Sequence, residues 1–476
     1  MSARAHQHRL RRLALRGAAA AFAATLVGHP AQAQDFAITN ATVALGDGSE
    51  PIPGGTVVVR GGRIAAAGAG VAVPAGVQSI DGQGRWVTPG LFSALTDLGL
   101  WDVEAVGESN DTASNSSPFG AALDVSPAIN PASQHIQISR AGGVTRASVT
   151  GQPGGSIFAG QGALIDLGAD NDAVQRRRAF QYVVLGENGG RIAGGSRVAA
   201  HALFRNALRE ALSFGDEGEG APLTANTREA EIELGDDIPL DPRLVDNERS
   251  RGQDVLLTRF DAAALVPVVS GRQPLYVGVD RASDILSVLA LREEFPNLRL
   301  VLVGAAEGWL VAQEIAASGV PVITEPLVDL PSRFEQLGAT QSNMGRMVDA
   351  GVKVAIGGFS GDNQPRYAPQ QAGNLVALGR VPGASGLTWG EALAAITSIP
   401  AEISGMAGAN GALAGVLAPG ALGDVVIWDG DPLELGSTPV QVFIDGIDQP
   451  LQNHQTRLRE RYRTPQEGAL PKAYEW

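Results

Sequence analysis

Cysteine is absent from the 476-residue sequence, which excludes disulfides, thiolate metal sites and cysteine nucleophiles. Lysine is nearly absent as well, because the chain contains only Lys353 and Lys472. Beyond the N-terminal region, no segment offers the roughly 18 consecutive apolar residues that a membrane-spanning helix needs. We therefore expect no membrane span in the mature chain. Glycine, in contrast, is abundant with 61 residues, and together with 28 prolines it indicates many short turns.

Histidine is also scarce, with six residues in the chain, of which three lie among the first 33 positions. The other three are His135, His201 and His454. His135 and His201 fall in helical patterns, and His454 lies in a polar C-terminal stretch. Three scattered imidazoles without the spacing of metal ligands do not indicate a zinc site.

The first 33 residues have the order of a secretory signal peptide: an arginine-rich start, an apolar run and a small-residue end. We expect cleavage after Ala33 and a periplasmic or secreted mature protein. The pair Arg11-Arg12 leaves both the general secretory route and the twin-arginine route open. An N-terminal amphipathic helix of the domain is the alternative interpretation.

The charge balance is acidic, with 50 Asp and Glu against 36 Lys and Arg and a formal net charge of -14. A surface of this sign repels phosphate backbones and anionic lipid, so we expect neither nucleic acid nor a membrane surface as a partner. Part of this charge lies in residues 216–254, an acidic interval with few apolar positions. We interpret this interval as a solvated surface insertion.

Short β-rich runs separated by glycine turns occupy residues 34–88 and return at about residues 410–460. FAITNATVAL is an example near the N-terminus, and GDVVIWDGDP is one near the C-terminus. This similarity of the two ends predicts one small β-sandwich built from both termini, and two unrelated β caps are the alternative. Residues 461–476 are expected to form a C-terminal tail.

The middle of the chain, residues 89–409, alternates short Val- and Ile-rich strands with helical stretches. LRLVLVG at residues 298–304, for example, precedes GWLVAQEIAAS at residues 308–318, whose apolar residues recur every three or four positions. This alternation predicts an α/β fold with a (β/α)8 TIM-like barrel, and a doubly wound open sheet is the alternative. Thr388 and Glu391 have the spacing of a capping box and predict a helix start.

Two motifs resemble one known family. The stretch VTPGLFSALTDLG at residues 87–99 begins with a turn and strand at Pro89-Gly90-Leu91, and LAPGALGDVVIWDGDP occupies residues 417–432. Together they resemble the metal-dependent amidohydrolase superfamily, in particular an exported branch that is similar to imidazolonepropionase and prolidase. The resemblance extends over nearly the whole mature chain. It implies a barrel enzyme that hydrolyses carbon–nitrogen bonds.

The resemblance also implies where a divalent metal would bind, at histidines and carboxylates on the C-terminal ends of barrel strands. The histidine pair expected after the first strand is replaced by Leu95 and Asp97. The histidine expected on a later strand is replaced by Gly278, and the next one falls at Gly304 or Ala305. None of these positions keeps the residue that the resemblance implies.

The aspartate expected at the end of the last barrel strand is Phe359 in this sequence. Neither lysine lies where the carbamylated lysine of the superfamily would bridge two metals. We therefore expect a lost metal site and no cofactor, with Leu95 and Phe359 filling the space of the metal. Asp97 is the only residue at these positions that still has a metal-binding side chain.

Two classes of function stay open at this stage. In the first, the protein is a non-catalytic or atypical member that binds a small amide or peptide-like ligand at the barrel mouth. It would act alone, as a homo-oligomer or paired with a metal-competent relative. In the second, it is a hydrolase of carbon–nitrogen bonds that uses Asp97, Asp280, Glu307 and Asp362. Those carboxylates would hold one divalent metal or act as acid and base without metal.

Overall fold

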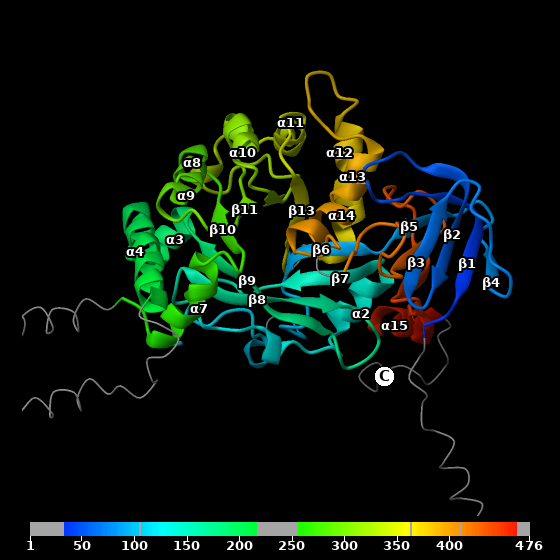
Figure 1. Ribbon diagram of the computed structural model, residues 1–476, viewed down its shortest axis with the longest axis horizontal. Helices are drawn as coiled ribbons and strands as arrows, with labels where there is room; N and C mark the ends of the chain where they lie inside the picture. The colour runs from blue at the N-terminus through cyan, green and yellow to red at the C-terminus, as the bar shows by residue number, and fades with distance from the viewer. Residues whose placement is uncertain (1–32, 104–105, 217–255, 362–363, 409–411, 464–476) are drawn as a thin grey trace, which may run out of the picture.

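The structure is a computed structural model, and it describes residues 33–103, 106–216, 256–361, 364–408 and 412–463 (Figure 1). The predicted signal peptide before Ala33 lies outside the described residues. The acidic interval beyond Asp216 and the C-terminal tail after Arg463 lie outside them as well.

A closed barrel of eight strands forms the central body, in the order β10-β11-β12-β13-β6-β7-β8-β9. The strands are β6 (Leu91–Thr96), β7 (Val144–Val149), β8 (Phe158–Asp166), β9 (Val174–Val184), β10 (Leu275–Val279), β11 (Leu300–Gly304), β12 (Val322–Thr324) and β13 (Val354–Phe359). The predicted α/β class and TIM-like barrel are confirmed. The short β-branched runs become its strands because this pleated surface is buried on both faces.

One barrel strand runs against its neighbours. β8 pairs antiparallel with both β7 and β9, whereas the other barrel pairs are parallel. The connections on either side of β8, residues 150–157 and 167–173, are too short for the crossover helix that parallel neighbours need. The strict alternation of strand and helix expected from the sequence is therefore interrupted here by a meander.

Helices cover the outside of the barrel, and Figure 1 shows several of them in an arc over its left and upper sides. The described α-helices are α2 (Gln134–Ala141), α3 (Gly186–Ile192), α4 (Arg197–Asp216), α7 (Arg259–Val269), α8 (Ala282–Leu289), α9 (Leu291–Glu294), α10 (Ala312–Ser318), α11 (Asn343–Asp349), α12 (Ala368–Leu378), α13 (Trp389–Ala394), α14 (Ser398–Ile403) and α15 (His454–Arg463), and α15 lies beside the second sheet rather than the barrel. The predicted capping box is confirmed, because the Thr388 side chain accepts from the Glu391 N–H and Glu391 accepts from the Thr388 N–H. None of the described helices is long and apolar enough to cross a membrane.

A second sheet, on the right in Figure 1, is built from both ends of the described chain. Its order is β16-β15-β14-β5-β1-β2-β3, and β4 pairs with β1. Its strands are β1 (Phe36–Val43), β2 (Ile52–Arg60), β3 (Arg63–Gly68), β4 (Gln78–Asp81), β5 (Trp86–Pro89), β14 (Val425–Trp428), β15 (Pro439–Ile444) and β16 (Ile447–Asp448). The β5–β14 pairing joins the N-terminal strands to the C-terminal ones.

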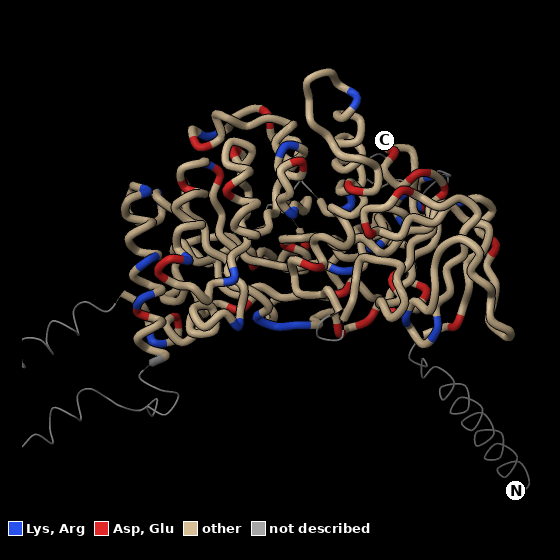
Figure 2. The backbone as a smooth tube through the Cα atoms, turned by 45° about the horizontal axis from the view of Figure 1, so that its top comes forward, with Lys and Arg blue, Asp and Glu red and all other residues tan. Residues whose placement is uncertain are grey.

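The inside of the barrel is packed towards one end. Phe180 stacks on Tyr276 with ring centroids 4.3 Å apart, and the Tyr276 hydroxyl donates to the Ile403 carbonyl at the end of α14. These side chains belong to an apolar cluster that fills the interior. The large cavity lies at the other end of the barrel, near the C-terminal ends of the strands. Figure 2 shows charged residues scattered singly along the surrounding backbone, with the two signs intermixed.

The barrel and the second sheet meet where β5 continues directly into β6 through Gly90. The Gly90 N–H donates to the Asp424 carbonyl at 3.0 Å, and a Cβ at this position would lie 2.1 Å from Thr145 Oγ1. Only glycine therefore fits between the two bodies. The strand that starts the barrel is fixed by this close backbone approach.

A buried ion cluster reinforces the same joint. Arg146 on β7 donates from Nε to Asp424 at 2.7 Å and from Nη2 to Asp445 at 2.7 Å, and the Arg146 and Asp424 side chains are each only 3% exposed. Burial alone would lower the pKa of Arg146, but the charges of Asp424 and Asp445 raise it above its usual value. Removing the cation would leave a buried carboxylate without its partner.

Arg146→Met is expected to lower the free energy of unfolding by about 3–5 kcal/mol, as for other broken buried ion pairs. Urea unfolding followed by circular dichroism measures the change. Arg60→Met is the matched control, because Arg60 pairs with Asp35 on the exposed surface and should change stability little. Equal unfolding midpoints for the two variants would contradict the structural role of the joint.

Asp166, at the end of β8, makes stability depend on pH. Burial raises its pKa to about 6, although the Gly168 N–H donates to it at 2.8 Å. An unfolded aspartate has a pKa of about 3.9, so the folded state binds more protons between these values. This contribution therefore favours the folded state below about pH 4 and is lost as the pH rises through 6, by up to about 3 kcal/mol.

Asp166→Asn is accordingly expected to raise the melting temperature at pH 7.5 and to flatten its decline between pH 4 and pH 6. Asp172→Asn, an exposed substitution in the following loop, is the control. A melting temperature that still falls equally over this range in Asp166→Asn would show that another group titrates.

Candidate functional site

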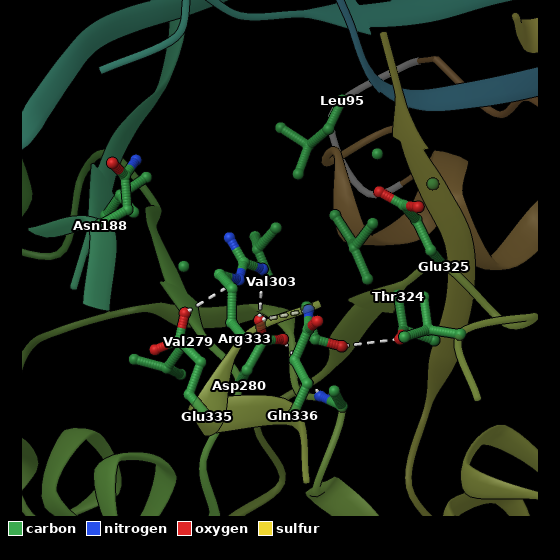
Figure 3. Close-up of a pocket in the computed structure, with 18 of the residues that line it drawn as sticks. Leu95, Asn188, Val279, Asp280, Val303, Thr324, Glu325, Arg333, Glu335 and Gln336 are labelled. Carbon is green, nitrogen blue, oxygen red and sulfur yellow. Dashed lines mark hydrogen bonds and ion pairs between the residues drawn. The ribbon is translucent and has the colours of Figure 1, made fainter. Parts of the chain in front are cut away.

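A cavity of about 660 Å³ opens at the C-terminal ends of the barrel strands. It is lined by residues from the ends of β6, β9, β10, β11, β12 and β13 and from the loop that follows β12. Leu95, Val279, Val303 and Ile323 form apolar parts of its wall (Figure 3). This volume suits a small organic molecule. The cavity lies where barrel enzymes of this architecture carry their active sites.

A fixed polar network forms one wall of the cavity. Asp280 follows β10 directly, and its Oδ2 accepts from Arg333 Nη2 at 2.8 Å and from Gln336 Nε2 at 3.0 Å. Its Oδ1 accepts from the Ala306 N–H at 3.2 Å. Figure 3 shows these side chains pointing towards one another. Asp280 thus accepts three hydrogen bonds, which hold its carboxylate in one position.

Glu335 is the second carboxylate beside Arg333, whose Nε lies 3.3 Å from Glu335 Oε1. The Glu187 N–H donates to Glu335 Oε2 at 2.7 Å. Gly186 has a φ of 67°, and a Cβ there would lie 2.2 Å from this oxygen, so the turn requires glycine. Burial raises the pKa of Glu335 and the charge of Asp280 adds to the rise, while the Glu187 N–H opposes it.

Glu325 is a third carboxylate of the cavity, and it comes directly after β12. Its side chain is exposed to water inside the cavity, although the walls of the cavity place protein around it. This enclosure raises its pKa, and the negative charge of Asp280 raises it further against the opposing charge of Arg333. Glu325 was not among the site residues predicted from the sequence. The signal was available, because this glutamate follows the apolar run VPVIT as Asp280 follows its own strand.

Leu95 has an unusual backbone conformation at the end of β6. Its φ is 53°, a left-handed value that is rare for a bulky residue, and its N–H donates to Ser148 Oγ at 2.8 Å. The side chain is 4% exposed, packs on the interior cluster and lines the cavity. Leu95 therefore lies at the cavity wall, and its filling of the space of a metal stays a prediction.

Asp97 does not share the cavity with Leu95. It lines a separate, water-sized cavity of about 10 Å³ together with Trp101 and His135, and its Oδ2 accepts from the Gly361 N–H at 3.1 Å. The left-handed Leu95 breaks the regular alternation of the strand, so the two side chains face different spaces. The Asp97 carboxylate therefore does not line the large cavity and does not contact a ligand bound there.

His135, on α2, lines the same small cavity as Asp97 and packs against Trp101. Its ring centroid lies 3.8 Å from that of Trp101, and burial lowers its pKa although Asp97 and Asp102 oppose this effect. Its Nε2 and the Trp101 Nε1 have no hydrogen-bond partner among the described residues.

Glu307 and Phe359, two further residues predicted for the site, do not line the large cavity. Glu307 accepts from the Ala282 N–H at 3.0 Å and from the Gly338 N–H at 3.1 Å, so it ties the start of α8 to the loop after β12. Phe359 is completely buried in the outer core and does not line the cavity. The expectation that Phe359 fills the space of a metal is wrong, because its side chain points away from the barrel interior.

Gly278 and Gly304 both line the cavity where the sequence analysis looked for metal ligands. A Cβ at Gly278 would lie 3.3 Å from the Tyr182 hydroxyl, and one at Gly304 would lie 2.5 Å from Asp280 Oδ1. The absence of side chains at Gly278 and Gly304 therefore leaves room for the Tyr182 hydroxyl and the Asp280 carboxylate. Asp362 lies outside the described residues.

The residues at these strand ends do not fit the divalent metal that the resemblance implies. In the described ranges, no group of three or more His, Cys, Asp or Glu side chains is arranged to hold a metal ion. Of the three predicted carboxylates that the structure describes, Asp97, Asp280 and Glu307, only Asp280 lines the large cavity, and its oxygens already accept from Arg333, Gln336 and a backbone N–H.

Comparison with solved structures identifies the fold. An amidohydrolase from Thermotoga maritima MSB8 matches with a TM-score of 0.69 at 22% identity, covering 87% of this chain and 99% of that one. A prolidase solved with N-methylphosphonate-L-proline matches with a TM-score of 0.46 at 17% identity, covering 88% of this chain and 100% of that one. The Thermotoga structure shows that this chain has the amidohydrolase fold, as the sequence motifs predicted.

Comparison of sequences gives one short match. The amidohydrolase tasK of Hapsidospora irregularis is 45% identical over 64 residues, which is 13% of this chain. The match spans only 6% of the length of that relative. No protein-family model matches the chain.

The side chains that line the cavity predict that the purified protein binds little zinc or manganese. After treatment with EDTA and dialysis against zinc or manganese, the purified protein is expected to retain well below one equivalent, measured by plasma mass spectrometry. One equivalent that is lost in Asp97→Ala would contradict this expectation, as would one that is lost in Asp280→Ala.

Proposed function

We propose that this chain, which has the amidohydrolase fold, is a pseudoenzyme that binds a small amide or peptide-like molecule at the barrel mouth. The observation that carries the proposal is the set of residues at the strand ends. Leu95, Gly278 and Gly304 line the cavity where metal ligands would be needed, and Asp280 is bonded to protein partners. A site of this kind offers shape and hydrogen bonds without an activated water.

The cavity is suited to an amide because its polar groups are fixed. Asn188 Oδ1 accepts from Arg191 Nη2 at 2.8 Å, which orients the side-chain amide and leaves its Nδ2 free to donate to a ligand carbonyl. Gln336 is held at both ends, by Ser332 Oγ at 3.0 Å and by Asp280. The apolar wall formed by Val303 and its neighbours would cover the remainder of the ligand.

A carboxylate-based hydrolase of carbon–nitrogen bonds is the second candidate. The raised pKa values of Glu325 and Glu335 favour it, because such groups hold a proton at higher pH than ordinary carboxylates and can act as acids. This version differs from the carboxylate set expected from the sequence, because among the described members of that set, Asp97, Asp280 and Glu307, only Asp280 belongs to the cavity lining.

We also propose that the mature protein is exported to the periplasm or beyond, on the basis of the signal-peptide pattern before Ala33. In that compartment the protein would bind its ligand alone, as a homo-oligomer or paired with a metal-competent relative. Fractionation of the producing cells tests the location.

Binding and turnover are separated by one experiment on the mature protein. Dipeptides and small amides are screened by thermal shift and then by calorimetry, and mass spectrometry follows the ligand over hours. The pseudoenzyme proposal predicts saturable one-to-one binding and recovery of the intact ligand. Stoichiometric binding followed by release of amine and acid products would favour the hydrolase instead.

The variant Ser360→Trp is expected to weaken binding at least about tenfold, because Ser360 is exposed inside the cavity and an indole would fill much of it. Ser213→Trp on the exposed face of α4 is the matched control and should bind normally. Unchanged affinity in Ser360→Trp would show that the ligand binds elsewhere.

A further inference from the structure

The side chains that line the cavity carry more negative than positive charge. Four acidic side chains and one arginine contribute to the lining in the described part of the chain: Asp280, Glu325, Asp329, Glu335 and Arg333. Arg333 lies within ion-pair distance of both Asp280 and Glu335, so its positive charge is already shared between two carboxylates. No cation of the cavity lining is left for Glu325 or Asp329.

Glu325 differs from the other enclosed carboxylates because no hydrogen bond or ion pair to another described residue is found for it. Asp280 accepts from Arg333, Gln336 and Ala306, and Glu335 accepts from Glu187. In Figure 3, Glu325 extends into the cavity from the β12 wall, apart from the Arg333 group, and no dashed line reaches it.

The backbone beside Glu325 leaves space for a ligand. Gly358 has a φ of 85°, and a Cβ at this position would lie 3.2 Å from Glu325 Oε1. Because glycine contributes no side chain here, the carboxylate lies next to bare backbone. Nothing at position 358 covers the carboxylate from that side.

Glu325 is exposed to water in the cavity, but the surrounding protein replaces part of that water, so an unpaired carboxylate there carries a cost. A ligand that brings a positive charge offsets this cost and forms a charge-assisted hydrogen bond. A ligand that brings a carboxylate would instead meet the excess negative charge of the cavity. The free donor of Asn188, on another wall in Figure 3, is available to a carbonyl of the same ligand.

We infer that the cavity selects small amide or peptide-like molecules that carry a protonated amine, with the ammonium group bound at Glu325. The apolar residues Leu95, Val303 and Ile323 contact the hydrocarbon part between the two polar ends. This inference rests on the proposed function, since it names the ligand class of the same cavity. It goes further in assigning Glu325 as the residue that determines charge specificity.

A pair of probes that differ only in charge tests the inference. L-leucyl-L-alaninamide has a free, protonated amino terminus, and its N-acetyl derivative has the same side chains and amides without the charge. Affinities are measured by calorimetry at pH 7 and physiological salt. The charged probe is expected to bind at least about tenfold more tightly, which corresponds to one charge-assisted pair in a partly enclosed site.

The variant Glu325→Gln keeps the size of the side chain and loses no bond to a described residue, so it should fold normally. It is expected to reduce binding of the charged probe at least about tenfold and to leave the acetylated probe unchanged. Glu314→Gln on the exposed face of α10 makes the same charge change away from the cavity and should leave both affinities as in the original protein.

The outcomes separate this inference from the function on which it rests. Equal or tighter binding of the acetylated probe, or loss of charge preference in Glu314→Gln, overturns the role of Glu325 and leaves ligand binding intact. Failure of both probes to bind at millimolar concentration contradicts the ligand class and the proposed function together. Cleavage of the charged probe would overturn the pseudoenzyme proposal, and the same charge preference would then be measured in kcat/KM.

Discussion

The joint at Gly90 fixes the position of the first barrel strand, and the cavity depends on it. Arg146 and Asp424 form a buried pair there, and the Gly90 N–H bonds to the Asp424 carbonyl, so β6 starts at a defined point against the second sheet. The register of β6 then determines where Leu95 lies at the other end of the strand. The fold is thus specified by turns, packing and this ion cluster, none of which needs a metal.

The left-handed conformation of Leu95 decides which side chains share the cavity. Leu95 closes its inner wall, while Asp97 faces the small space beside Trp101 and His135. The polar character of the cavity comes instead from β10, β12 and the loop that contains Arg333. The carboxylates of this cavity therefore come from later strands and their loops, and not from the strand that carries the recognisable motif.

The sequence was sufficient for the barrel and the two-ended sheet, because apolar periodicity and turn residues determine these features. Leu95, Gly278 and Asp280, which were singled out at strand ends, line the cavity. The sequence was insufficient for Asp97, Glu307 and Phe359. Those assignments assumed that residues at or after a strand end face the barrel interior. The left-handed backbone of Leu95, for example, turns Asp97 towards a different space. The antiparallel β8 was missed because a short connection, rather than its composition, sets its direction. Glu325 was missed because the resemblance directed attention to other positions.

The central claim is that the cavity holds its ligand with protein groups at the ends of β10, β12 and β13 and has no metal centre. A crystal structure of the mature protein, grown with zinc and with the charged dipeptide amide and recorded at the zinc absorption edge, tests this most directly. The account predicts an ammonium group beside Glu325 and no anomalous peak in the cavity. An anomalous peak coordinated by Asp280 or Glu325, with the ligand carbonyl on the metal, would contradict it.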